Sequence, residues 1–246
     1  MMDMNIPQEL DFLRPVVESA HKAYPPDWGD LLSIYRILRA ENRVSALEFG
    51  SGWSSLVIAS ALASNQADGN ITFRHPHPFW LTSIEASDVF ANETLRMAKL
   101  AGVTNLSVHV SKVSMSTHAG VLCHVFDQSP LVTADFIYLD GPDAYQVQGE
   151  VRGLSVSFGD SEKTYGLPMS ADILLQESTF WPGTRILTDG RGGNARFLAT
   201  HLSRNWKYSY DSEQDQHSFL LVEPHWGRHS QGLLDHLNVP ELAELS

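Results

Sequence analysis

The stretch Leu47-Glu48-Phe49-Gly50-Ser51-Gly52-Trp53-Ser54-Ser55 decides the fold, because it predicts a short strand, a glycine-rich turn and the start of a helix in succession. Gly50 and Gly52 permit the backbone angles of a tight turn and let a ligand approach the main chain closely. Ser54 and Ser55 are residue types that cap the first turn of a helix. A Gly-x-Gly turn also occurs where a strand merely passes into a helix, so the surrounding sequence must decide whether this one holds a ligand.

Length and composition favour one large α/β domain. The 246 residues are 43% hydrophobic, which is enough to bury a full core, and no Gly/Ser-rich or Pro-rich linker divides them. We expect a helical lead-in over residues 1–43, a ligand-binding α/β core over residues 44–223 and a tail over residues 224–246, all within this single domain.

Charge and hydropathy exclude several classes of partner. The formal net charge of −12 disfavours nucleic acid, because phosphate-binding surfaces need clustered Lys and Arg. The sequence contains neither a run of about 18 apolar residues nor a basic, apolar leader, so no membrane partner and no secretion is expected. The single cysteine, Cys123, excludes an internal disulfide and is typical of a reducing compartment. We therefore expect a cytoplasmic protein that acts on a small molecule, with the oligomeric state open and a homodimer among the options.

Helix and strand patterns alternate along the chain. Asp30 is placed to cap a helix ahead of the first strand, and Ser87 and Gly102 are placed to begin and end a later one. Further strands are expected at 80–84, 106–110, 135–139 and 184–188, and further helices at 54–63, 169–178 and 194–202. Residues 207–210 and 218–222 flank a polar link, as the strands of a hairpin do. This order predicts a doubly wound, mostly parallel sheet.

Four acids stand at or beside the carboxyl ends of the expected strands, namely Glu48, Glu85, Asp140 and Asp189. Ligands of doubly wound sheets bind outside these ends. An acid is seldom placed next to a core without a partner, although each of the four could also be a solvated loop residue.

From about Val44 to Val222, these features resemble the class I S-adenosylmethionine-dependent methyltransferases. Residues 47–52 resemble the first motif of that superfamily, with Ser54 in place of the usual third glycine. Glu85 resembles the acid that accepts hydrogen bonds from both ribose hydroxyls, although residues 68–79 set it farther from Glu48 than usual. Residues 135–141 resemble the fourth-strand motif, whose terminal acid, Asp140, lies near the methyl donor or the acceptor.

The resemblance implies a seven-stranded Rossmann-like sheet with an antiparallel C-terminal hairpin strand, and S-adenosylmethionine as the cofactor. The acid of the first motif either orients the turn or reaches the cofactor's amino group, and the residues after Glu85 border the adenine. The implied cofactor-binding residues are Glu48, Gly50, Ser51, Gly52, Trp53, Ser54, Ser55, Glu85, Ala86, Ser87 and Asp140.

Within the superfamily, the spacing of Asp140 and Asp189 and the late sequence 216–220 resemble the catechol and caffeoyl-coenzyme A O-methyltransferases. In that branch, two strand-tip acids and an adjacent asparagine hold a divalent metal. Here Gly190 stands in place of the asparagine, and Asp143 stands where the catechol enzymes have a lysine base. Asp140 and Asp189 could bind Mg²⁺ through oxygens and waters, but two carboxylates are an incomplete set, so a site without metal is favoured.

The sequence therefore predicts methyl transfer from S-adenosylmethionine to a small molecule, at oxygen. Asp140 is the first candidate for orienting or deprotonating the acceptor, and Asp189 is the second. One alternative is a non-catalytic S-adenosylmethionine-binding protein, which the departures at Asp143 and Gly190 suggest. Another is an NAD-dependent oxidoreductase, which the closing hairpin disfavours because a nicotinamide-binding domain normally continues in parallel.

Two further features of the sequence each allow two interpretations. Residues 189–196 either bind an anionic or hydroxylated acceptor or form a loop that Asn194 caps. Trp53 either covers the cofactor or packs on the sheet. The histidine-proline alternation at 74–80 is expected to form an extended surface turn without a ligand role.

Overall fold

A seven-stranded sheet with the order β10-β11-β9-β6-β1-β2-β3 forms the centre of the computed structural model, which describes residues 6–19, 25–156, 166 and 168–243. All neighbouring strands are parallel except β11, which runs antiparallel to both β9 and β10. The predicted doubly wound sheet with an antiparallel C-terminal strand is thus confirmed. The strands are β1 (Ala46–Phe49), β2 (Leu81–Glu85), β3 (Leu106–Val110), β6 (Phe136–Leu139), β9 (Arg185–Asp189), β10 (Trp206–Asp211) and β11 (Gln216–Leu221).

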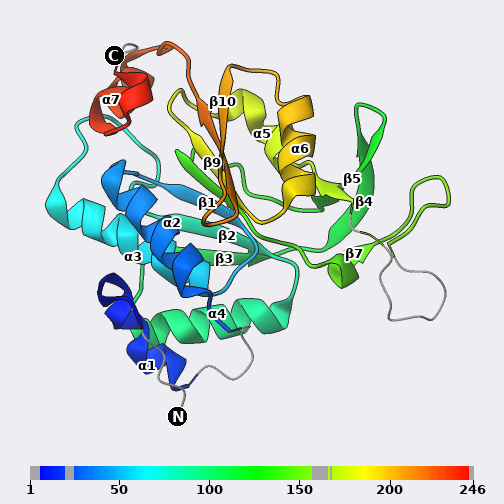
Figure 1. The fold of residues 1–246 in the computed structure, drawn as a ribbon, viewed down its shortest axis with the longest axis horizontal. Coiled ribbons are helices and arrows are strands. Elements are labelled where there is room, and N and C mark those ends of the chain that lie inside the picture. Colours follow the sequence, from blue (N-terminus) through cyan, green and yellow to red (C-terminus); the bar gives the residue numbers. More distant parts are fainter. Residues whose placement is uncertain (1–5, 20–24, 157–165, 167, 244–246) are drawn as a thin grey trace.

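Helices cover both faces of this sheet (Figure 1). On one face pack α2 (Trp28–Ala40), α3 (Trp53–Asp68) and α4 (Asp88–Ala101), and on the other pack α5 (Asp172–Gln176) and α6 (Gly192–His201). The central strands are buried on both faces because successive side chains alternate between the two cores. In β6, for example, Phe136 and Tyr138 belong to the first core, whereas Ile137 and Leu139 belong to the second.

A second, four-stranded sheet was not predicted. Its order is β7-β4-β5-β8, and its strands are β4 (Val113–His118), β5 (Val121–Phe126), β7 (Val147–Gln148) and β8 (Met169–Ser170). The β4–β5 hairpin turns at Ala119 and Gly120, which have φ angles of 50° and 78°, as a two-residue hairpin loop requires. Cys123 lies fully buried in β5.

The helix predicted at 169–178 was wrong at its start. Met169 and Ser170 pair with β5 as strand β8, so α5 begins only at Asp172 and continues as a 3-10 helix over Glu177–Thr179. The two strand residues sit beside a hairpin distant in sequence, and no local pattern signals such a pairing.

Two predicted caps are also corrected. Asp27, rather than Asp30, caps α2, because its carboxylate accepts the N–H groups of Gly29 at 2.9 Å and Asp30 at 3.3 Å. Asn194 lies inside α6, and its side-chain oxygen instead accepts the N–H of Ser170 at 3.0 Å. The caps of α4 are confirmed, since Ser87 accepts the N–H of Phe90 and Gly102 ends the helix with a φ of 72°.

The lead-in contributes a 3-10 helix (Gln8–Leu13) and α1 (Arg14–Val17), and the tail contributes α7 (Arg228–His236) and a 3-10 helix (Pro240–Leu242). Leu233 and Leu234 of α7 pack with Val44 and Leu220, which ties the tail to the core. Residues 1–5, 157–165 and 244–246, parts of the predicted lead-in, core and tail, lie outside the described residues, as do residues 20–24 and 167. No described helix is both long and apolar enough to cross a membrane. The division into lead-in, core and tail of one domain stays a prediction.

Candidate active site

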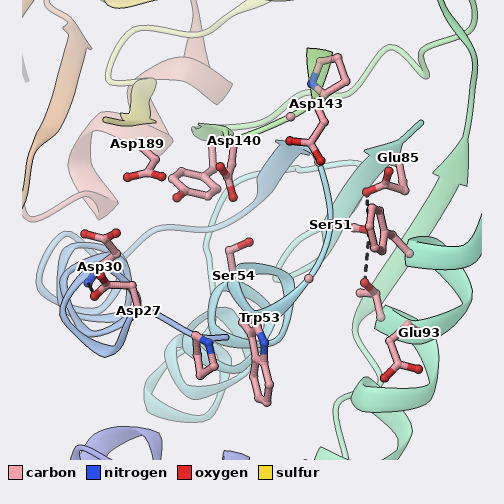
Figure 2. A pocket seen from close by; sticks show the side chains of 18 of the residues that line it. Asp27, Asp30, Ser51, Trp53, Ser54, Glu85, Glu93, Asp140, Asp143 and Asp189 are labelled. Atoms are coloured by element: carbon pink, nitrogen blue, oxygen red, sulfur yellow. Dashed lines mark hydrogen bonds between the residues drawn. The ribbon is translucent and has the colours of Figure 1, made fainter. Parts of the chain in front are cut away.

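A pocket of about 270 Å³ lies at the carboxyl ends of β1, β2, β6 and β9 (Figure 2). Helices α2 and α4 complete its walls. The structure brings most of the predicted site residues together in its lining, namely Gly50, Ser51, Gly52, Trp53, Ser54, Glu85, Ala86, Asp140 and Asp189. Three predicted cofactor residues, Glu48, Ser55 and Ser87, do not line it.

Glu48 lies beneath the glycine-rich turn and is fully buried. Its carboxylate accepts three serine hydroxyls, from Ser54 at 2.6 Å and from Ser55 and Ser83 at 2.5 Å. Burial raises the pKa of Glu48 to about 7, against the lowering effect of these hydrogen bonds. Of the two predicted roles of this acid, its contacts therefore support orienting the turn rather than touching the cofactor.

The start of α3 differs from the predicted serine cap. Gly52 is the N-cap residue, and its N–H donates to the hydroxyl of Ser55 at 3.0 Å. Ser55 thus serves the helix from the third helical position, whereas the hydroxyl of Ser54 is bonded to Glu48.

The glycines keep the turn after β1 open and close to the turn after β6. Gly50 has a φ of 107°, and a Cβ on Gly141 would lie 2.7 Å from the Cα of Gly50, a clash between two backbones. A Cβ on Gly52 would meet no protein atom within 4 Å. Because Gly52 lines the pocket, a side chain there would occupy space that a ligand needs.

Hydrogen bonds hold Glu85 in place at the end of β2, where it lines the pocket. Its carboxylate accepts the hydroxyl of Ser51 at 2.8 Å (Figure 2). It also accepts the N–H of Ser87 at 2.8 Å, and the amide nitrogen of Gln146 lies 3.5 Å away. Burial raises the pKa of Glu85. Each carboxylate oxygen has two lone pairs, so Glu85 retains acceptor capacity for hydroxyl groups of a ligand. Ser87 contributes indirectly, because its backbone N–H holds Glu85 and its side chain caps α4.

Asp140 lies at the tip of β6 beside Arg191. The guanidinium of Arg191 donates to the backbone carbonyls of Asp140 and Pro142 and lies 3.6 Å from the Asp140 carboxylate. Burial raises the pKa of Asp140 to about 7, and the neighbouring charges of Asp189 and Asp143 act in the same direction, whereas Arg191 opposes them. The side chain of Asp140 is nevertheless 43% exposed to the pocket, where it can reach a ligand.

Asp189 and two acids of the α2 start form the side of the pocket opposite Glu85 (Figure 2). Burial raises the pKa of Asp189, and that of Asp30 rises to about 6 through burial and the charges of Asp189 and Asp27. Among the described residues, no group of three His, Cys, Asp or Glu side chains could hold a metal ion.

Several lining residues were not predicted. Asp27 and Asp30 come from a helix start rather than a strand tip, and Tyr138 lies within β6, two residues before its terminal acid. Phe90, Thr94 and Met97 of α4 also line the pocket. Their helical spacing indicates that they share one face of the helix, and this was the only sequence signal for these lining residues.

Trp53 lines the pocket while only 8% exposed, and its ring makes an edge contact with Trp28 of α2 at 6.2 Å between ring centroids. That it covers the cofactor stays a prediction. Residues 74–80 are not part of the described pocket lining.

No protein-family model matches this sequence, and no curated protein matches it either. Similar solved structures include the O-methyltransferase TomG from Streptomyces achromogenes in complex with S-adenosylmethionine, with 14% identity over 87% of this chain and 89% of that chain and a TM-score of 0.45. An O-methyltransferase from Bacillus cereus in complex with S-adenosylhomocysteine has 13% identity over 89% and 94% of the two chains, with a TM-score of 0.47.

The tRNA (m1A58) methyltransferase TrmI from Aquifex aeolicus has 11% identity over 88% of this chain and 77% of that chain, with a TM-score of 0.45. Similarity at this level assigns neither an acceptor nor a reaction to the present chain.

Proposed function

We propose that this chain is an S-adenosylmethionine-dependent methyltransferase that acts on an oxygen atom of a small-molecule acceptor. One observation carries the proposal. The open turn at Gly50 and Gly52, the anchored carboxylate of Glu85 and the strand-tip acid Asp140 line the same pocket at the carboxyl ends of neighbouring parallel strands.

The residues present fit the cofactor. The unobstructed backbone at Gly52 suits the methionine portion, and the carboxylate of Glu85, which the amide of Gln146 reaches only at 3.5 Å, suits a ribose hydroxyl. Ala86 and Gln146 would border the adenine. Glu48, Ser55 and Ser87 would act indirectly, by holding the turn, the start of α3 and Glu85.

The chain's own part in the reaction is positioning and proton removal. When bound, S-adenosylmethionine supplies a methyl group that its sulfonium already activates. Asp140 accepts the proton of the acceptor hydroxyl, and a pKa of about 7 suits a general base near neutral pH. Arg191 fixes the backbone of Asp140, and Asp189 orients the acceptor from the neighbouring strand. Alignment of this kind contributes up to about 7 to 11 kcal/mol in the best cases.

The antiparallel strand β11 supports this proposal over an NAD-dependent oxidoreductase. A non-catalytic S-adenosylmethionine-binding protein is the second candidate, because Gly190 and Asp143 replace the asparagine and the lysine of the catechol-type enzymes. Such a protein would bind the cofactor and transfer no methyl group.

Calorimetry with S-adenosylhomocysteine and with NAD tests the ligand, and incubation of a metabolite extract with a methyl-labelled donor tests the reaction. We expect S-adenosylhomocysteine alone to bind and label to enter small molecules. Asp140→Asn should lower turnover by about 10² to 10⁴, the usual contribution of a general base, without changing affinity for S-adenosylhomocysteine. Absence of S-adenosylhomocysteine binding would refute both candidates, and binding without transfer would favour the second.

A further inference from the structure

The side of the pocket opposite Glu85 carries acids that form no ion pair with a described cation, although the charge of Arg191 opposes the rise in the pKa of Asp189. Asp30 and Asp189 line this side and form no ion pair with a described residue. Arg191 is the only Lys or Arg in the described lining, and it is engaged by Asp140 and the backbone beside it. Figure 2 shows Asp27, Asp30 and Asp189 gathered together, away from Glu85 and Ser51. On this side of the pocket, the carboxyl groups of the described lining therefore outnumber its cations.

Tyr138 adds an independent observation. Its side chain lines the same pocket and is only 3% exposed, yet its hydroxyl makes no hydrogen bond to any described residue. The ring of Tyr138 is buried, but its hydroxyl is not among the buried polar atoms that lack both a partner and contact with solvent, so its open hydrogen-bonding position faces the pocket. Burial raises the pKa of the Tyr138 phenol, and the charges of Asp140, Asp189, Glu48 and Asp30 act in the same direction. The missing partner of Tyr138 is thus expected from a ligand that enters among these acids.

We infer that the acceptor carries a protonated amine, which binds between Asp30 and Asp189 and donates its third hydrogen bond to the hydroxyl of Tyr138. An alkylammonium group has three N–H donors and no acceptor, so it matches two carboxylates and one phenol oxygen. Asp140 lies between Glu85 and this amine site (Figure 2). A hydroxyl elsewhere in the acceptor can therefore meet the methyl donor beside Asp140. This inference deepens the proposed function and rests on it.

The first experiment identifies the charge of the methylated products. A metabolite extract is incubated with the protein and a donor carrying a deuterated methyl group, and new deuterated products are separated by electrophoresis at neutral pH and detected by mass spectrometry. We expect them to migrate as amine cations or as amine-bearing zwitterions. Products without an amine, or no products from a protein that binds S-adenosylhomocysteine, overturn the inference.

The second experiment uses defined probes. The protein saturated with S-adenosylhomocysteine is titrated with tyramine, 4-ethylphenol and 3-(4-hydroxyphenyl)propionate, which share a phenol and differ in the charge at the other end. Tyramine should bind at least about tenfold more tightly than the neutral probe, as expected for a hydrogen-bonded charge pair. Equal affinities, or no binding of tyramine, overturn the inference.

Variants then locate the amine. Asp30→Asn and Asp189→Asn should each weaken tyramine about tenfold, and Tyr138→Phe, which keeps the ring, about threefold. Glu213→Gln removes an exposed acid from the β10–β11 turn and should change nothing. All four variants should keep the wild-type affinity for S-adenosylhomocysteine.

The outcomes separate this inference from the function on which it rests. If the wild-type protein fails to bind S-adenosylhomocysteine, the proposed function falls and the amine site falls with it. If binding is intact but Asp30→Asn and Asp189→Asn weaken S-adenosylhomocysteine itself, these acids hold the cofactor, and only the amine site is overturned. The amine site alone is also overturned if Asp30→Asn and Asp189→Asn both bind tyramine as tightly as the wild-type protein does.

Discussion

Glu48 and Asp140 are acids whose pKa values burial raises to about 7, yet only Asp140 faces the pocket. Their protonation therefore affects different properties. Protonation of Asp140 lowers the reaction rate, because a protonated carboxyl cannot accept the acceptor's proton. Protonation of Glu48 changes the stability of the fold, because its three serine partners lie within the protein.

The rate of methyl transfer should rise with pH through about 7 and then level off, since Asp140 becomes a base only above its pKa. Initial rates at limiting acceptor concentration, measured from about pH 5 to 9, test this. Asp140→Asn should remove the inflection and leave a low, flat profile. A wild-type rate that is independent of pH over this range would exclude Asp140 as the general base.

The free energy of unfolding should fall as the pH rises from about 4.5 to 7, in part because of Glu48. Its pKa is raised in the folded state, so the folded protein binds the proton more tightly than the unfolded chain in this window. A full shift of this size corresponds to about 3 kcal/mol. Glu48→Gln should flatten the dependence in urea denaturation across this range, and Glu213→Gln should not. Equal slopes in wild type and Glu48→Gln would contradict this account.

The site depends on the contact between the turns after β1 and β6. Gly141→Ala should place a methyl group against the backbone of Gly50, so one turn must shift. We expect a loss of about 1 to 3 kcal/mol in stability and a clear loss of S-adenosylhomocysteine affinity, measured by denaturation and calorimetry. Gly69→Ala is the matched control, because its Cβ would meet no atom within 4 Å and its φ of −178° suits any residue. Unchanged affinity in Gly141→Ala would show that the turns do not shape the ligand site.

Elements with a strong local signal were predictable. Helix α4 was recognised from its cap at Ser87 and its end at Gly102, and β3 from the alternation over residues 106–110. The second sheet was missed because β7 and β8 are two residues long and gain their partners only across the fold. The cap of α2 was misplaced because Asp27 and Asp30 are both good capping residues, and only the extended backbone at Asp27 distinguishes them.

A buried arginine connects several segments at the end of the sheet opposite the pocket. Arg43 is fully buried, donates to the backbone carbonyls of Asp135 and Gly183 and pairs with Glu41, which also pairs with Arg185. Arg43→Met should cost about 3 to 5 kcal/mol, because it removes the donor of two buried carbonyls and the cation 3.7 Å from the buried carboxylate of Asp135, although Glu41 keeps Arg185.

Chemical denaturation measures this loss, and the folded fraction should keep its affinity for S-adenosylhomocysteine. Arg14→Met provides the control, since Arg14 and Asp11 form an exposed pair that is expected to contribute little. A similar stability of Arg43→Met and Arg14→Met would contradict the structural role of Arg43.

The order of the main strands and helices, the glycine-rich turn at 50–52 and the position of Glu85, Asp140 and Asp189 at strand tips were all predictable from the sequence. These features follow from short-range patterns, namely side-chain periodicity, caps and turn residues. The sequence did not predict that Glu48 lies beneath the turn instead of in the pocket, or that Asp30 of α2 lines the same pocket as Asp189 and Tyr138; both follow from the packed fold. The reason is physical, because the packing of α2 against the sheet and the burial of each acid depend on residues far apart in the chain.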